Sequence, residues 1–308
     1  MEHRIHLKTV GLGNGETLGY REREGGNETL LLIHGNMTSS RHWDVLLEQM
    51  DEKYHIIAVD LRGFGLSTYH RPIDSMKDFA DDLKLVVNAL DLPSFYLMGW
   101  SMGGAVAMQF AADHPGSVRK LILLAPASTR GYPFYRLDAQ GKPVDRLKTK
   151  AEIVNDPGKT IPVLQAYAEK NKDFLRMMWN SLIYTRRQPS DERYEAYLED
   201  MCTQRNLADV YHALNTFNIS SENNGLEPGS GAARRIQVPT LVLWGENDRI
   251  VTEQMVQEII QDIGTHAQLV YLKNCGHSPL IDDCSQLIQQ VTRFLNTESG
   301  GNSNDEIR

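Results

Sequence analysis

The sequence lacks the features that would mark a membrane or secreted protein. No run of about 18 apolar residues is present, so we expect no segment that spans a bilayer. The opening residues, MEHRIHLK, contain no apolar core followed by a small-residue cleavage site, and no secretory signal is expected. Cysteine is scarce, and Cys202, Cys275 and Cys284 form neither a metal-binding spacing nor a CxxC pair. These absences predict a cytoplasmic protein with reduced thiols.

Basic charge and cofactor motifs are also lacking. Acidic residues outnumber basic ones by 40 to 32, which gives a formal net charge of -8. Because phosphate binding needs a basic face, this balance argues against a nucleic acid partner. No HExxH sequence occurs, and Gly11 to Gly15 (GLGNG) does not complete GxGxxG and precedes a strand, so we predict a turn there. No metal and no redox cofactor is expected.

The sequence does contain an alternation of strands and helices. A chain of 308 residues that is 41% hydrophobic is long enough for one large α/β domain or one domain with a sizeable insertion. Helices are predicted over 40–50, from the Asp74-Ser75 cap to Leu90, and after Ser101. Strands are predicted over 16–24, 29–34, 55–60, 95–99, 118–125, 240–245 and 268–272. This alternation predicts a mainly parallel sheet that is covered on both faces.

The alternation breaks between about Ser128 and Arg235. Helical stretches occur there over 161–170 and 191–203, but no buried strand is evident. We therefore expect a helical cap, or lid, inserted between two strands. The expected division is a core formed by 1–127 and 236–296, the cap over 128–235, and a disordered polar tail over 297–308.

One serine stands in an otherwise apolar stretch. Gly99-Trp100-Ser101-Met102-Gly103 has the pattern G-x-S-x-G, between a predicted strand and a predicted helix. So sharp a turn forces unusual dihedral angles on the serine, and a Cβ on either side of it would clash. The turn exposes the hydroxyl at a helix N-terminus, where the potential is positive. Ser101 is thus a candidate nucleophile.

A serine hydroxyl needs a base that takes its proton and an acid that holds the base. His277 lies in the loop that follows the last predicted strand, and Asp248 follows the strand over 240–245. The carboxyl ends of parallel strands are where open α/β sheets place their sites. Glu246 is a second acid in the same loop. His114, at a helix end before a proline, is expected to be a surface or capping residue.

These motifs together resemble the α/β-hydrolase superfamily over about Leu7 to Leu295. The landmarks, in chain order, are HGN (34–36), Trp43, DLRGFG (60–65), GWSMGG (99–104), and the pair GEND (245–248) and CGH (275–277). The resemblance implies a mainly parallel eight-stranded sheet and the chain order serine, acid, histidine, which favours Asp248 over Glu246.

The resemblance also implies an oxyanion hole built from the backbone N–H groups of Asn36 and Met102. The His34 side chain is expected to bond nearby backbone, and the loop 60–67 is expected to be a structural turn. Ser101, Asp248 and His277 would then cleave an ester through an acyl-enzyme, which water or a thiol resolves.

Within the superfamily, the GWSMG box, the chain length and the inserted cap resemble the intracellular poly(3-hydroxybutyrate) depolymerases of Bacillus-type bacteria. The cap carries 11 of the 24 aromatic residues, together with Met177, Met178 and Met201, as an apolar or polymeric acyl substrate would need. Packing among cap helices is the simpler explanation for any one aromatic. Expected substrate contacts are Trp100, Tyr132, Phe134 and Trp179. The expected partners are a polyester granule surface and a second copy of the chain, bound through the cap.

Two other functions fit the same residues. One is a carboxylesterase or lactonase that acts on small soluble esters. The other is a hydrolase-like receptor that binds a ligand and signals, although such receptors have a shorter cap than the 107 or so residues here. A haloalkane dehalogenase would need an aspartate in place of Ser101.

Overall fold

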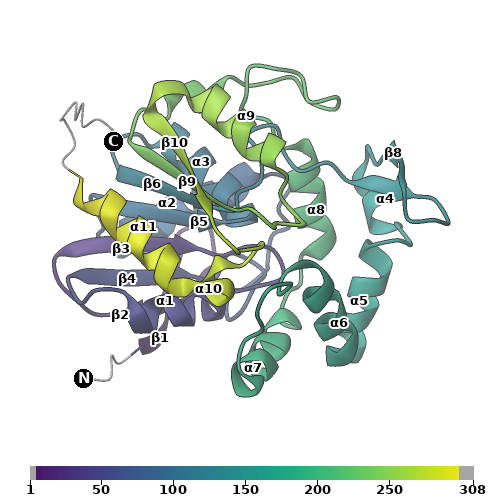
Figure 1. Cartoon of the computed structure of the whole chain (residues 1–308), viewed down its shortest axis with the longest axis horizontal. Coiled ribbons are helices and arrows are strands. Elements are labelled where there is room, and N and C mark those ends of the chain that lie inside the picture. The colour runs from purple at the N-terminus through teal and green to yellow at the C-terminus, as the bar shows by residue number, and fades with distance from the viewer. Residues whose placement is uncertain (1–4, 298–308) are drawn as a thin grey trace.

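The computed structural model describes residues 5–297, which form an eight-stranded, mainly parallel sheet with helices on both faces (Figure 1). The strand order is β1-β2-β4-β3-β5-β6-β9-β10. Only β2 runs antiparallel to its neighbours, and the other described pairs of this sheet are parallel. The strands are β1 (Ile5–Gly11), β2 (Thr17–Arg23), β3 (Glu28–Ile33), β4 (Tyr54–Val59), β5 (Phe95–Trp100), β6 (Val118–Leu124), β9 (Thr240–Gly245) and β10 (Ala267–Leu272).

Helices from distant parts of the chain cover the two faces of the sheet. On one face, α1 (Asp44–Gln49), α10 (Pro279–Asp282) and α11 (Cys284–Asn296) pack together. On the other lie α2 (Met76–Ala89), α3 (Met102–Asp113) and α9 (Glu253–Ile263). Figure 1 shows α11 in front of the strands and α3 behind them. The predicted fold class is therefore confirmed.

The local sequence explains why these elements form where they do. In β3 the residues from Leu30 to Ile33 are fully buried, as a continuous apolar strand covered on both faces must be. Helix α2 begins with a capping box, in which the Asp78 carboxylate accepts the Ser75 backbone N–H at 2.8 Å. The predicted turn at Gly11 to Gly15 joins β1 and β2, and the Gly15 N–H donates to the Leu12 carbonyl at 3.0 Å.

The chain between β6 and β9, here called the inserted segment (residues 128–235), is mostly helical. Figure 1 shows its helices gathered to one side of the sheet. The predicted stretches 161–170 and 191–203 correspond to α5 and α7. Its elements are β7 (Tyr135–Leu137), β8 (Pro143–Arg146), α4 (Lys150–Val154), α5 (Thr160–Glu169), α6 (Lys172–Leu182), α7 (Asp191–Met201) and α8 (Leu207–Thr216). That this segment acts as a cap remains a prediction.

Two strand features were not predicted from the sequence. None of the residues in the edge strand β1 is fully buried, so its apolar pattern is weak. The residues of the β7–β8 hairpin are likewise half-buried or exposed, so no run of buried apolar residues marks the hairpin in the sequence.

The predicted disordered tail lies, apart from Thr297, outside the described residues. Between residues 5 and 297, no helix has both the length and the apolar character that a bilayer crossing requires.

Candidate active site

Ser101 occupies a strained turn between β5 and α3. Its backbone angles, φ 56° and ψ -118°, lie in a region that L-residues rarely adopt. The turn is held by the Ser101 N–H, which donates to the Leu124 carbonyl at 2.9 Å, and by the Gly104 N–H, which donates to the Ser101 carbonyl at 2.9 Å. A residue that is costly in this conformation persists because the surrounding sheet and helix fix it.

The glycines around Ser101 are required by close backbone contacts. A Cβ on Gly99 would lie 2.2 Å from the Gly103 carbonyl oxygen, and one on Gly103 would lie 2.3 Å from the Ile33 carbonyl oxygen. A Cβ on Gly104 would meet Pro126 at 2.6 Å. The predicted tight turn is therefore confirmed, and Gly103 and Gly104 also let α3 pack closely on the sheet.

The structure brings His277 and Asp248 to Ser101 in hydrogen-bonding order. His277 Nε2 lies 3.0 Å from Ser101 Oγ, and His277 Nδ1 lies 2.9 Å from Asp248 Oδ2. The Asp248 side chain is fully buried, and its other oxygen accepts the backbone N–H groups of Ile250 at 2.7 Å and Val251 at 3.0 Å. This arrangement can pass a proton from the hydroxyl to the imidazole and stabilise the imidazolium that forms.

The two acids of the loop after β9 have different positions. The exposed Glu246 accepts the Asn274 backbone N–H at 2.9 Å, whereas Asp248 faces His277. Trp100 also supports the histidine, since its indole N–H donates to the His277 carbonyl at 2.9 Å. Asp248, as the sequence favoured, is thus the acid that holds the imidazole.

The loop that follows β3 and carries Asn36 lies against the turn at Ser101, where an oxyanion hole was expected. Asn36 and Met102 both line the same cavity as Ser101. Met102 is the first residue of α3, so its N–H has no acceptor within the helix. The buried His34 bonds backbone as expected: its Nε2 accepts the Leu61 N–H at 3.0 Å, and its Nδ1 lies 2.7 Å from the Gly35 carbonyl. Burial lowers the pKa of His34.

A buried amide that was not predicted links this loop to the inserted segment. Gln204 lies between α7 and α8, and its Nε2 donates to Asn36 Oδ1 at 2.9 Å and to Asn206 Oδ1 at 3.0 Å. Its Oε1 accepts the Tyr167 hydroxyl at 3.0 Å. Asn206 in turn donates to the Arg62 carbonyl at 2.7 Å. The inserted segment therefore helps to position Asn36.

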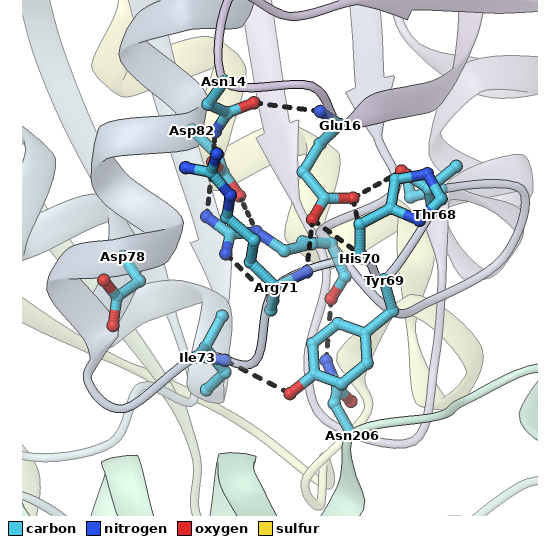
Figure 2. Close-up of polar contacts among 12 residues, drawn as sticks. Asn14, Glu16, Thr68, Tyr69, His70, Arg71, Ile73, Asp78, Asp82 and Asn206 are labelled. Atoms are coloured by element: carbon cyan, nitrogen blue, oxygen red, sulfur yellow. Dashed lines mark hydrogen bonds and ion pairs between the residues drawn. The ribbon is translucent and has the colours of Figure 1, made fainter.

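Arg62 belongs to a buried polar network under the loop 60–67. Its guanidinium donates two hydrogen bonds of 2.6 Å to Asp82. Figure 2 shows Asn14 beside Asp82, with Glu16 opposite Thr68, His70 and Arg71. The Glu16 carboxylate accepts the backbone N–H groups of His70 at 3.0 Å and Arg71 at 2.9 Å. The expectation that this loop is structural is confirmed.

A cavity of about 580 Å³ opens above Ser101. Of its 25 lining residues, 15 come from the inserted segment, among them the predicted contacts Tyr132, Phe134 and Trp179; Trp100 lines it as well. The half-buried Tyr132 lies near the acid of the site, and its desolvation together with the Asp248 charge raises its pKa to about 12. The walls are mostly aromatic and aliphatic, which suits an apolar acyl group.

One expectation about the surface of the inserted segment is wrong. Met201 is fully buried and packs in the core instead of lining a substrate surface. The aromatic residues of this segment are buried or half-buried, as packing among its helices predicts, so they do not form an exposed binding face. Among the described residues, its exposed large apolar side chains are instead Val144, Val154, Ile161, Leu164, Met177 and Leu182.

Comparisons with known proteins agree with this fold. A hydrolase of Paraburkholderia phymatum named 2-hydroxy-6-oxononadienedioate/2-hydroxy-6-oxononatrienedioate hydrolase is 26% identical over 283 residues, which is 90% of each chain. A Burkholderia vietnamiensis hydrolase of the same name is 27% identical over 283 residues, again 90% of each chain.

Solved structures of an esterase and of a hydrolase share the fold. An esterase from Exiguobacterium antarcticum has a TM-score of 0.72 at 18% identity, covering 94% of this chain and 99% of its own. A hydrolase from Pseudomonas aeruginosa has a TM-score of 0.72 at 20% identity, covering 95% and 99%. The family model of the alpha/beta hydrolase fold matches residues 28–283. The chain therefore belongs to the alpha/beta hydrolase fold family.

Proposed function

We propose that this protein is a serine hydrolase of carboxylic esters and that its substrates are short-chain 3-hydroxyalkanoate polyesters, poly(3-hydroxybutyrate) in particular. The observation that carries the ester chemistry is the hydrogen-bonded series from Ser101 through His277 to Asp248, set below a mostly apolar cavity. The cavity suits a small branched acyl chain because its walls are largely hydrophobic and aromatic.

In the proposed reaction, Ser101 Oγ attacks the ester carbonyl while His277 Nε2 takes the hydroxyl proton. Asp248 holds the imidazolium, and the backbone N–H groups of Asn36 and Met102 stabilise the oxyanion. Collapse of this intermediate releases the alcohol, which receives the proton from His277. Water, deprotonated by His277, then attacks the acyl-enzyme and frees both the acid and Ser101.

Exposed aliphatic side chains support a water-insoluble substrate. Ile161 and Leu164 on α5 and Met177 and Leu182 on α6 are exposed, and the last two also line the cavity. Apolar surface that continues into an active-site cavity is typical of enzymes that act at an insoluble surface. These side chains replace the aromatics as candidates for granule contact.

The names of the curated relatives favour a second candidate, hydrolysis of a carbon–carbon bond in a dienedioate. Such a substrate carries two carboxylates, which need cationic partners when they are buried. Among the described residues that line the cavity, Lys159 is the one lysine or arginine. The cavity therefore suits an ester with at most one charged end better than a dianion.

The decisive experiment compares three substrates with purified wild-type protein and Ser101→Ala. Amorphous poly(3-hydroxybutyrate) granules should release soluble acid, and p-nitrophenyl butyrate should be cleaved with accumulation of an acyl-enzyme visible by mass spectrometry. Both activities should fall about a millionfold in Ser101→Ala. Faster cleavage of the dienedioate than of either ester would establish the second candidate. A single burst without steady turnover would point to a receptor.

A matched pair of variants tests granule contact. Ile161→Ser with Leu164→Ser should weaken granule hydrolysis while p-nitrophenyl butyrate hydrolysis stays at the wild-type rate. The control is Leu7→Ser on β1, which is 48% exposed and lies outside the inserted segment. Equal granule hydrolysis by all of these proteins would refute the role of these side chains.

A further inference from the structure

Among the described residues that line the cavity, one is a lysine and none is an arginine, aspartate or glutamate. Lys159, at the start of α5, lines the cavity together with Pro162 and Val163. Its ammonium Nζ lies 5.5 Å from the centroid of the Phe134 ring, which is also a wall residue. The lysine therefore presents its positive charge on the aromatic side of the cavity.

The aromatic side chains next to Lys159 continue toward the triad. Phe134 packs on Tyr211 and Tyr132, with ring centroids 4.5 Å and 5.5 Å apart. Tyr132 lies near enough to Asp248 for that charge to raise its pKa. A ligand that extends from Ser101 along these rings would reach the ammonium.

Lys159 has no carboxylate partner among residues 5–297. Other lysines of the inserted segment form ion pairs, for example Lys150 with Asp209 at 2.7 Å and Lys172 with Glu199 at 2.9 Å. The charge of Asp156 acts on Lys159, but the hydrogen bond of this carboxylate is to the Lys159 backbone N–H, at 2.7 Å. Burial lowers the pKa of Lys159, and Asp156 offsets this effect only in part.

A partly desolvated ammonium without an ion pair is costly, and an anionic ligand group would lower that cost. Lysine acts as a compact point charge on a flexible stem, so it can follow a carboxylate at the end of a flexible chain. Acids are absent from the described residues of the cavity wall, so nothing there would repel such a ligand.

We propose that Lys159 binds the free carboxylate end of the substrate. Resting on the proposed function, this inference names the preferred substrates as short 3-hydroxyalkanoate oligomers with a free acid end. Ester bonds near that end of a polymer would be cleaved in preference to interior ones. The last ester bond of an oligomer has the carboxylate in its alcohol part, which leaves as a hydroxy acid.

The test uses the free acid and the methyl ester of the same 3-hydroxybutyrate trimer, so that only the charge differs. Calorimetry on the Ser101→Ala protein measures binding without hydrolysis. We expect the free acid to bind about 10- to 100-fold more tightly than the methyl ester, the range for a hydrogen bond to a charged group. Lys159→Met in the same background should remove this preference, and Lys159→Arg should keep most of it.

The control is Lys142→Met, the same charge change on the exposed turn between β7 and β8, away from the cavity. It should bind both trimers as the Ser101→Ala parent does. Equal binding of the two trimers by the parent, or a preference that survives Lys159→Met, would overturn the proposal. If Lys159→Met does not fold, Lys159→Gln replaces it, and the comparison of trimers by the parent still decides.

Failure of the proposed function gives a different result. A wild-type protein that cleaves neither the trimers nor p-nitrophenyl butyrate would refute the ester hydrolase, whatever the binding data show. A protein that cleaves both trimers with equal kcat/KM, and binds them equally, would keep the function and refute the role of Lys159.

Discussion

The side-chain amide of Gln204 donates a 2.9 Å hydrogen bond to Oδ1 of Asn36, whose backbone N–H we assign to the oxyanion hole. Loss of a whole oxyanion donor costs about 10²- to 10³-fold in kcat, and a displaced donor costs less. Gln204→Met should therefore lower kcat about tenfold and leave KM within about twofold. Steady-state kinetics with p-nitrophenyl butyrate measures the split.

The same variant removes the hydrogen bonds that Gln204 makes to Asn206 Oδ1 and to the Tyr167 hydroxyl, so the free energy of unfolding should fall by about 1 to 3 kcal/mol. Gln165→Met on the exposed face of α5 is the control and should change neither quantity. A loss of stability with unchanged kcat would show that Gln204 is only structural.

Asp248 and Glu246 provide a second comparison within one loop. Asp248→Asn should lower kcat about 10⁴-fold, because an amide favours the wrong tautomer of His277. Glu246→Gln should stay within about threefold of wild type, since Glu246 is exposed and bonds the Asn274 backbone. The measurement is kcat for both variants at one pH. A larger loss in Glu246→Gln would reverse our assignment of the acid.

Neighbouring aspartates on α2 should differ strongly in their effect on stability. The Asp82 carboxylate is 1% exposed and paired with Arg62, whereas Asp81 is 53% exposed and paired with Lys77 at 2.6 Å. Asp82→Asn should destabilise the fold by about 3 to 5 kcal/mol because it leaves the Arg62 charge without its buried ionic partner. Asp81→Asn should cost about 0.5 kcal/mol or less. Urea denaturation of both variants tests this, and equal midpoints would contradict it.

Alanine substitutions at Gly103 and Gly116 test how closely α3 packs on the sheet beside Ser101. Gly103→Ala places a Cβ against the Ile33 and His34 carbonyl oxygens at 2.3 Å and 2.5 Å, so it should destabilise by about 3 kcal/mol or more. Gly116→Ala meets no atom within 4 Å and should be neutral or stabilise by up to about 1 kcal/mol. Thermal unfolding of the two variants distinguishes them. Similar melting temperatures would rule out the close approach of α3 to the sheet.

The three cysteines should be inert toward thiol reagents in the folded protein. Burial raises the pKa of Cys275 and of Cys284 to about 12 and raises that of Cys202 as well. A thiol with a pKa of about 12 is a thiolate in only about one molecule in 10⁴ at pH 8, and the thiolate is the reactive form. Iodoacetamide at pH 8 should therefore leave activity intact, and all three thiols should react only in guanidinium. Rapid inactivation with labelling of Cys275, two residues before His277, would contradict this.

The arrangement of Ser101, His277 and Asp248 was predictable because each of them follows a strand and lies in a recognisable local sequence. Ser101 has its flanking glycines, and Asp248 and His277 lie in loops at the carboxyl ends of neighbouring strands. Gln204 was not predictable, since the residues of its bond to Asn36 are 168 positions apart and no short pattern marks them. The burial of Met201 was hidden for a related reason: a helix that packs on several sides shows no single apolar face.

The residues that line the cavity and the residues that would react come from different parts of the chain, which affects how substrate preference can diverge within the family. The reacting groups stand on loops of the sheet, while most of the wall comes from one continuous stretch of the chain. Under the proposed function, mutations in that stretch would alter which acyl group is accepted while proton transfer among Ser101, His277 and Asp248 stays unchanged. Selection could then change the substrate range of such a hydrolase without changing its reacting groups, provided that the hydrogen bond from Gln204 to Asn36 is kept.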